Sequence, residues 1–79
     1  MALDRRNVEK VIARRLAPLF AVDGGRVDVV SVNDGRGAVR VRFEGSYRAC
    51  PSREILARRV LEPTLRQELP ELRVVEWID

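Results

Sequence analysis

Apolar residues in the first quarter of the chain recur at three- and four-residue steps, which predicts an amphipathic helix. These positions are Val8, Val11, Ile12, Leu16, Leu19 and Phe20. Asp4 or Asn7 is suited to cap the start of this helix by accepting a backbone N–H bond. Pro18 lies late in the pattern and is predicted to kink or tighten the last turn. Asp23-Gly24-Gly25 should end the helix, because glycine adopts the left-handed C-terminal conformation without penalty.

A period of two replaces the helical period in the next segment and predicts a β-hairpin. Residues 27–32 are rich in β-branched side chains, and residues 33–37 are a turn cluster with two glycines. Residues 38–44 then alternate between apolar and charged side chains. We expect Val39, Val41 and Phe43 to face inward, and Arg40, Arg42 and Glu44 to face water. The sheet should therefore have one covered face and one wet face.

A second helical pattern starts near Pro51-Ser52, with Ser52 as the expected cap. Its apolar positions are Ile55, Leu56, Val60, Leu61, Leu65 and Leu69. Pro63 interrupts this pattern, which predicts a kink or two helical pieces, and Pro70 ends it. Residues 72–78 form the last predicted strand, where Trp77 is expected in the core at the sheet edge or in a subunit contact.

The order helix, strand, strand, helix, strand predicts an α+β fold in a single domain, residues 1–79. Two helices must cover one face of a three-stranded sheet, since a small sheet needs its apolar face buried. A right-handed crossover should make the last strand parallel to the second, giving a mixed sheet in a two-layer domain. The predicted buried residues are Val27, Val29, Val39, Val41, Phe43, Ile55, Leu65 and Val75.

Charge and composition disfavour several classes of function. The chain has fifteen basic residues, all but Lys10 arginine, twelve acidic residues and no histidine. Basic and acidic residues are interleaved along the chain, which is typical of a solvated surface. The net charge of +3 is nevertheless compatible with nucleic-acid binding. An enzyme is disfavoured, because the chain lacks histidine, a phosphate-cradling glycine-rich loop and a second thiol. The charged start and the absence of a long apolar run predict a cytoplasmic protein with no signal peptide or membrane span.

The single cysteine, Cys50, is the main candidate for chemistry. It is predicted to lie in an accessible loop just before a helix, where backbone N–H groups and the nearby Arg48 and Arg53 would stabilise a thiolate. A thiolate favours metal binding, persulfide formation or oxidation, whereas the alternative is a small buried apolar residue. Tyr47 stands three residues upstream, where a Cys-x-x-Cys pair would have its other thiol. Tyr47 either covers the core with its hydroxyl in water or offers a phenolate to iron.

Several segments in order resemble a known family, the C-terminal domain of NifU, which occurs alone or fused in Nfu-type proteins. The segments that carry the resemblance are 8–11, 21–25, 27–30, 39–45, 49–52 and 69–72. This resemblance implies an iron–sulfur cluster scaffold or carrier whose loop carries Cys-x-x-Cys, so that two subunits hold one four-iron cluster. Cys50 matches the second cysteine of that motif and is therefore the expected cofactor-binding and metal-binding residue. Tyr47 replaces the first.

A homodimer of this chain offers two thiolates where a four-iron cluster takes four. The cofactor expected from the resemblance is an iron–sulfur cluster with impaired or shared ligation, completed by Tyr47, glutathione or cysteines of an assembly or target protein. One alternative is a cluster-free adaptor that binds such a protein. A second is RNA binding, because the element order also resembles a bacterial KH domain. KH domains use a Gly-x-x-Gly loop between two helices, and the chain has none there.

Overall fold

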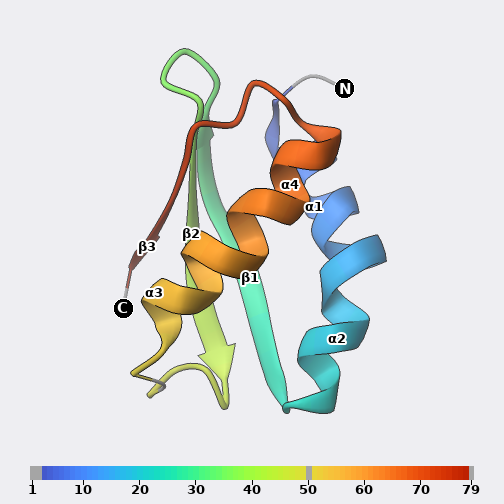
Figure 1. The fold of residues 1–79 in the computed structure, drawn as a ribbon, viewed down its shortest axis with the longest axis vertical. Coiled ribbons are helices and arrows are strands. Elements are labelled where there is room, and N and C mark those ends of the chain that lie inside the picture. Colours follow the sequence, from blue (N-terminus) through green and yellow to red (C-terminus); the bar gives the residue numbers. More distant parts are fainter. Residues whose placement is uncertain (1–2, 50, 79) are drawn as a thin grey trace.

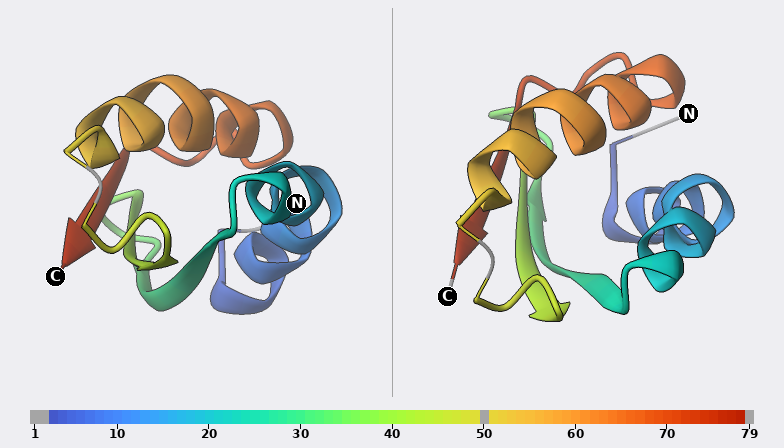
Figure 2. Two further views of the ribbon diagram at one scale, coloured as in Figure 1. Left: turned by 90° about the horizontal axis from the view of Figure 1, so that it is seen from below. Right: turned by 60° about the horizontal axis from the view of Figure 1, so that its bottom comes forward.

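A three-stranded sheet carries two helices on one of its faces (Figures 1 and 2). The computed structural model describes residues 3–49 and 51–78. The first helix consists of α1 (Arg5–Val11), a π-helical segment η1 (Ile12–Leu16) and α2 (Ala17–Val22). The second consists of α3 (Arg53–Ile55), a π-helical segment η2 (Leu56–Leu61) and α4 (Glu62–Glu68). The strands are β1 (Gly25–Asn33), β2 (Ala38–Gly45) and β3 (Val74–Ile78).

The strand order β1-β2-β3 confirms the predicted mixed sheet. β1 runs antiparallel to β2, and β3 runs parallel to β2 after the crossover through the second helix. The alternation in β2 is also as predicted, with Val39, Val41 and Phe43 buried toward the helices. The last registered pair of β2 and β3 is Arg42 with Ile78. Residues 43–45 of β2 lie beyond the registered pairs of the described residues.

Each helix buries a residue at every fourth position. The buried residues in this repeat are Val8, Ile12, Leu16 and Phe20 in the first helix and Ala57, Leu61, Leu65 and Leu69 at the second. In a regular α-helix a four-residue repeat drifts by about 40° per step. A π-helical turn closes its hydrogen bond one residue later and takes back part of that drift. The segments η1 and η2 therefore keep both stripes facing the sheet.

This repeat explains one wrong prediction about burial. Ile55 is 56% exposed, because it lies two positions before Ala57, on the opposite side of the helix. Leu19, one of the apolar positions of the first helical pattern, is also 56% exposed, whereas Phe20 beside it is buried. The other predicted core residues are buried, and Leu3, Tyr47 and Leu72 join them.

The two helix prolines follow directly after the π-helical segments. Pro18 and Pro63 each occupy the second residue of the α-helical piece that comes next. Because proline has no N–H, it cannot form the α-helical bond to the carbonyl four residues back. The π-helical turn lies ahead of Pro18, whereas the predicted kink or tightening concerned the last turn and stays a prediction. The division of the second helix around Pro63 is as predicted.

Three predictions about helix ends have different outcomes. Asp4 caps α1, accepting the N–H of Asn7 at 2.8 Å. Gly24 follows the first helix with a φ of 74°, as its stop signal predicts. Ser52 occupies the cap position of α3 but its side chain makes no capping bond. α3 is only three residues long, and its first turn is held instead by the bond from the Leu56 N–H to the Ser52 carbonyl.

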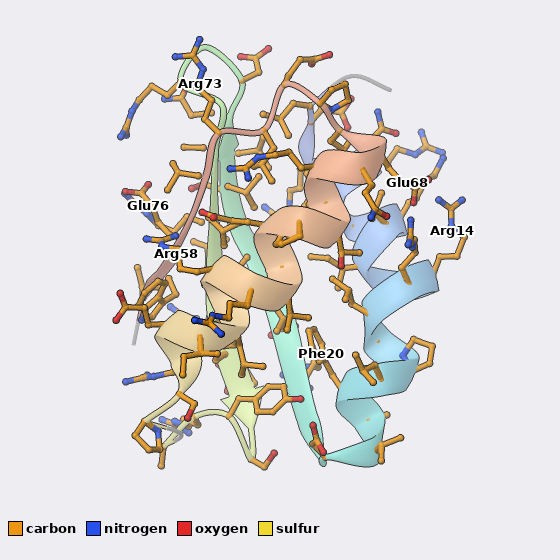
Figure 3. The ribbon with its side chains drawn as sticks, in the orientation of Figure 1. Arg14, Phe20, Arg58, Glu68, Arg73 and Glu76 are labelled. Carbon is orange, nitrogen blue, oxygen red and sulfur yellow. The ribbon has the colours of Figure 1, made fainter. Side chains whose placement is uncertain are left out.

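Glu62 is the one buried charged residue in the described parts of the chain, at 8% exposure. Its Oε1 accepts the backbone N–H of Val75 at 2.9 Å and a guanidinium N–H of Arg58 at 2.8 Å. Arg58 also donates to the Val75 carbonyl, and its guanidinium lies over the Trp77 ring, 5.3 Å from the centroid. Figure 3 shows Arg58 reaching from the helix toward β3. One carboxylate thus ties the second helix to the edge strand.

Arg66 likewise forms hydrogen bonds with the backbone of the segment before β3. Its guanidinium donates to the carbonyls of Leu72 at 3.2 Å and Arg73 at 2.6 Å. An edge strand with open backbone groups invites pairing with another chain. Around residues 72–75 these groups are occupied by side chains of the second helix, which disfavours pairing at that edge.

Removal of the Glu62 side chain should therefore destabilise the protein strongly. We expect Glu62→Ala to lower the free energy of unfolding by about 3 kcal/mol, because Arg58 and the Val75 N–H lose a buried partner. Urea denaturation followed by circular dichroism measures this. Glu54→Gln, on the exposed side of the same helix, is the control and should change it by less than about 0.5 kcal/mol. An equal effect of both variants would contradict the assigned role.

A second charge contact joins the two helices. Arg14 donates to both carboxylate oxygens of Glu68 at 2.6 Å, and Arg15 lies 3.7 Å from one of them (Figure 3). The hydrogen bond from Arg14 is the main reason that the pKa of Glu68 lies below its usual value of 4.5. A depressed carboxyl pKa contributes stability above the unfolded-state pKa, and that contribution disappears as the pH falls through the folded-state pKa.

The melting temperatures of wild type and Glu68→Gln should therefore differ at pH 7 and converge as the pH falls below about 4.5. Thermal melts from pH 7 to pH 3 measure this, with Glu54→Gln, an exposed position of the same helix, as a control that retains the Arg14 contact. A difference that stays constant over this range would show that the charge of Glu68 is not what matters.

Candidate functional site

The loop that carries Cys50 begins at the end of β2 and leads into α3 (Figure 1). Residues 46–49 and 51–52 form turns on either side of Cys50. Cys50 itself lies outside the described residues, so its accessibility and its role as cofactor and metal ligand stay predictions. The flanking residues nevertheless define where the loop starts and ends and what holds it.

The end of the first helix holds the start of this loop. The Ser46 N–H donates to the Gly24 carbonyl at 3.0 Å, and the Ser46 hydroxyl donates to the Asp23 carbonyl at 2.7 Å. Gly45 has a φ of 65°, and a Cβ at this position would collide with the Gly24 carbonyl oxygen. The Asp-Gly-Gly stop signal therefore both ends a helix and anchors the cysteine loop.

The Tyr47 side chain is buried where the loop meets the end of the first helix, with 6% of its surface exposed. Its ring meets Phe20 and Phe43 edge-on, with centroids 5.4 and 6.3 Å away. Its hydroxyl donates to the Asp23 carboxylate at 2.9 Å. The prediction that Tyr47 covers the core is confirmed, whereas the prediction of a hydroxyl in water is wrong because the carboxylate at the helix end takes it. A phenolate ligand to iron is not supported, since the oxygen is committed to Asp23.

Gly25 makes room for the Tyr47 ring. A Cβ at position 25 would lie within 3.0 Å of three ring atoms, although the φ of Gly25 is not in the left-handed region. The requirement for glycine here is therefore steric. Gly25 and Tyr47 fit each other as a pair, a relation that the spacing of the sequence could not reveal.

A cavity of about 420 Å³ lies beside the loop, lined by Arg42, Phe43, Glu44, Arg48 and Arg53. It lies beside the end of β2, from which the loop leads into α3. We call this space the arginine notch. Arg42 and Glu44 form a loose ion pair of 4.0 Å, and Arg53 donates to the Arg48 carbonyl at 3.4 Å. Sequence reasoning noted two of these arginines but not that Arg42 joins them.

Neither a preformed metal site nor a membrane helix is found in the part of the chain that the structure describes. Residues 3–49 and 51–78 contain no group of three or more acidic, histidine or cysteine side chains able to hold a metal ion. No helix among them is both long and apolar enough to cross a membrane.

Comparison with known proteins decides the family. The model of the NifU-like domain matches residues 8–76. The chain belongs to the NifU-like domain family. The match runs from α1 to β3 and includes both the helix-end anchor and the cysteine loop. The resemblance drawn from the sequence segments is thereby confirmed.

Relatives of this NifU-like domain are organellar proteins by name. It is 34% identical over 74 residues to NifU-like protein 2, chloroplastic, of Arabidopsis thaliana, covering 94% of the chain and 30% of the relative. It is 33% identical to NifU-like protein 1, chloroplastic, of Oryza sativa, covering 89% and 30%. It is 27% identical to the mitochondrial NFU1 iron-sulfur cluster scaffold homolog of Drosophila grimshawi, covering 90% and 23%. The chain thus spans less than a third of each relative, and its cytoplasmic location stays a prediction.

Substitutions at Gly25 and Tyr47 should be coupled. We expect Gly25→Ala to lower the free energy of unfolding by about 2 kcal/mol, because the added methyl group overpacks the Tyr47 ring. In a Tyr47→Ala background the same change should be nearly neutral, since the ring is gone. Denaturation of the two single variants and the double variant forms the cycle. Additive effects would show that the glycine is required for another reason.

Proposed function

We propose that this domain, residues 1–79, serves in iron–sulfur cluster assembly or transfer and contributes Cys50 as its one cluster ligand. Membership of the NifU-like family supports the cluster role. The commitment of the Tyr47 hydroxyl to Asp23 supports the restriction to one ligand per chain. The domain acts as a carrier rather than as an enzyme, and the cluster is its cargo.

Ligand count then determines how the cargo is held. A four-iron cluster takes four thiolates, and two copies of this chain supply two. The other two positions must be filled by thiols from elsewhere, either a small thiol or cysteines of an assembly or target protein. We propose that the domain works as a homodimer or beside such a protein. It holds its cluster only when these additional thiols are present.

Anaerobic reconstitution with iron and sulfide tests this proposal. After desalting, the wild-type protein alone should retain far fewer than about four irons per dimer, because half of the cluster positions are open. With glutathione present it should retain iron and show a cluster absorption band. Cys50→Ser should retain none in either condition, with Ser52→Ala, whose side chain makes no capping bond, as a loop control that keeps the thiol.

Two outcomes would contradict the proposal in different ways. If the wild-type protein holds about four irons per dimer unaided, a further ligand exists and the one-ligand reading is wrong. If it holds no iron under any condition, the cluster role fails and the cluster-free adaptor becomes the better function. Exposed apolar residues favour that second candidate, since Leu19, Val22 and Ile55 are 56%, 84% and 56% exposed. Two of them lie on α2, whose end anchors the cysteine loop.

A further inference from the structure

The two edges of the sheet differ in how their backbone groups are occupied. At the β3 edge both backbone groups of Val75 are bound by side chains of the second helix. At the β1 edge a guanidinium N–H of Arg5 donates to the Val29 carbonyl at 3.1 Å. No side chain within residues 3–49 and 51–78 forms a hydrogen bond with the backbone of residues 25–28. This half of the β1 edge is therefore open to a further strand.

Two hydrogen bonds show which backbone groups of β1 face the open edge. The Ser46 N–H donates to the Gly24 carbonyl at 3.0 Å, which directs residue 24 toward β2. The Val29 carbonyl accepts from Arg5 of α1, which is not part of the sheet. Backbone groups point to alternate sides along an antiparallel strand. Both bonds therefore agree that the N–H and carbonyl groups of residues 25, 27 and 29 face the open edge.

A groove runs between this edge and the first helix. Two cavities of about 490 and 250 Å³ share the lining residues Ile12, Ala17, Arg26 and Val27, so they are parts of one groove. Figure 2 shows the first helix on the β1 side of the sheet. On the helix, Ala13 and Ala17 are exposed and line the groove with small apolar side chains. An added strand would have backbone partners at its side and an apolar wall above it.

A β-bulge limits the length of the open segment. The pairing of β1 with β2 shifts by one residue between Val29 and Ser31. A bulge increases the local twist and disfavours further pairing at an edge. Arg5 occupies the Val29 carbonyl at the same point. The segment open to pairing is therefore residues 25–29, which span about 17 Å when extended.

The side chains along this segment define the chemistry of the occupant. In an added antiparallel strand, the residues opposite positions 25, 27 and 29 point toward the helix wall, which suits small apolar side chains. The residues opposite Arg26 and Asp28 point to the open face of the sheet. Arg26 and Asp28 pair with each other at 3.1 Å but remain 69% and 49% exposed, so each has room for a second partner. An acid opposite Arg26 and a base opposite Asp28 would stabilise the strand pair.

A second copy of the chain is the competing occupant, because residues 25–29 themselves read Gly-Arg-Val-Asp-Val. Two-fold pairing centred on Val27 would set Arg26 opposite Asp28 of the second copy. It would also place both first helices on the same face and over the same junction, since each lies on the β1 side of its sheet (Figure 2). A segment of another protein brings only a strand, and it therefore fits the groove better.

We propose that residues 25–29 of β1 bind an extended segment of a partner protein as an added antiparallel strand. From its N-terminus, that segment reads apolar, basic, apolar, acidic, apolar. Main-chain hydrogen bonds would supply the affinity, and the alternating side chains the specificity. The inference goes beyond the proposed function, because it names a surface for a protein partner that requires neither a cluster nor Cys50.

The test uses the capped peptide Ser-Val-Lys-Val-Glu-Val-Ser, titrated into the metal-free protein and followed by backbone amide signals in NMR spectra. Binding should shift the signals of residues 25–29 most and slow hydrogen exchange at Val27. N-Methylation of the central valine removes the donor aimed at the Val27 carbonyl and should weaken binding at least tenfold. N-Methylation of the lysine, whose N–H points away from β1, is the matched control and should leave binding unchanged. Exchanging lysine and glutamate in the peptide should weaken binding about threefold.

Substitutions on α2 test the groove from the protein side. Ala17→Arg places a long charged side chain in the groove and should weaken peptide binding at least tenfold. Leu19→Arg, at an exposed position of α2 outside the lining, is the matched control and should leave binding unchanged. Circular dichroism of both variants distinguishes lost binding from unfolding.

Several outcomes would overturn the inference while leaving the cluster proposal intact. These are no binding of the peptide, equal binding of the peptide methylated at the central valine, or loss of binding in Leu19→Arg but not in Ala17→Arg. Sedimentation showing a wild-type dimer that Ala17→Arg dissociates would assign the edge to a second copy instead. Conversely, peptide binding at β1 by a protein that retains no iron in the reconstitution would support the strand site and contradict the cluster role.

Discussion

The contact between the end of the first helix and the start of the cysteine loop is the constraint on which the functional end of this domain depends. Asp23 accepts the Tyr47 hydroxyl through its carboxylate and the Ser46 hydroxyl through its carbonyl. Gly24 accepts the Ser46 N–H, and Gly25 leaves space for the tyrosine ring. Two motifs that are about twenty residues apart in sequence are therefore one structural unit. Because the aromatic ring also fills the core against Phe20 and Phe43, the loop is fixed to the hydrophobic core as well as to the helix end.

This unit gives Tyr47 a structural role. The resemblance of the sequence to the NifU family implies a cysteine ligand at position 47, whereas the ring here is buried against Phe20 and Phe43. One residue cannot do both, because a ligand must face the cluster and a buried ring must face the protein. Under the proposed function, an outside thiol is therefore the complement of Cys50.

The sequence predicts much of the fold, and the reasons for its failures are physical. Periods of two and near four identify the strands and helices, and the crossover rule gives the parallel pairing of β2 and β3. The wrong assignment of Ile55 arises because a 3.6-residue period does not anticipate the π-helical turns ahead of the prolines. Glu62 was missed because a glutamate in a helix is read as exposed, and only the tertiary fold reveals the Val75 N–H and Arg58 around it. For the site, spacing identified Cys50 and the anomaly at Tyr47, but no pattern could show that Gly25 and Arg42 belong to it.

The distribution of charge also separates the competing functions. On the open face of the sheet arginines stand next to acids, as in Arg26 with Asp28 at 3.1 Å and Arg40 with Glu76 at 3.8 Å. Nucleic-acid binding relies on a continuous basic surface that releases counterions from many phosphates. Alternating signs give no such surface, so the excess of arginine in the composition does not favour RNA. At the loop, Arg42 lies 4.0 Å from Glu44 and Arg53 donates to the Arg48 carbonyl. Arginines on the sheet and at the loop thus have acidic or backbone partners, and their number alone does not indicate a surface for nucleic acid.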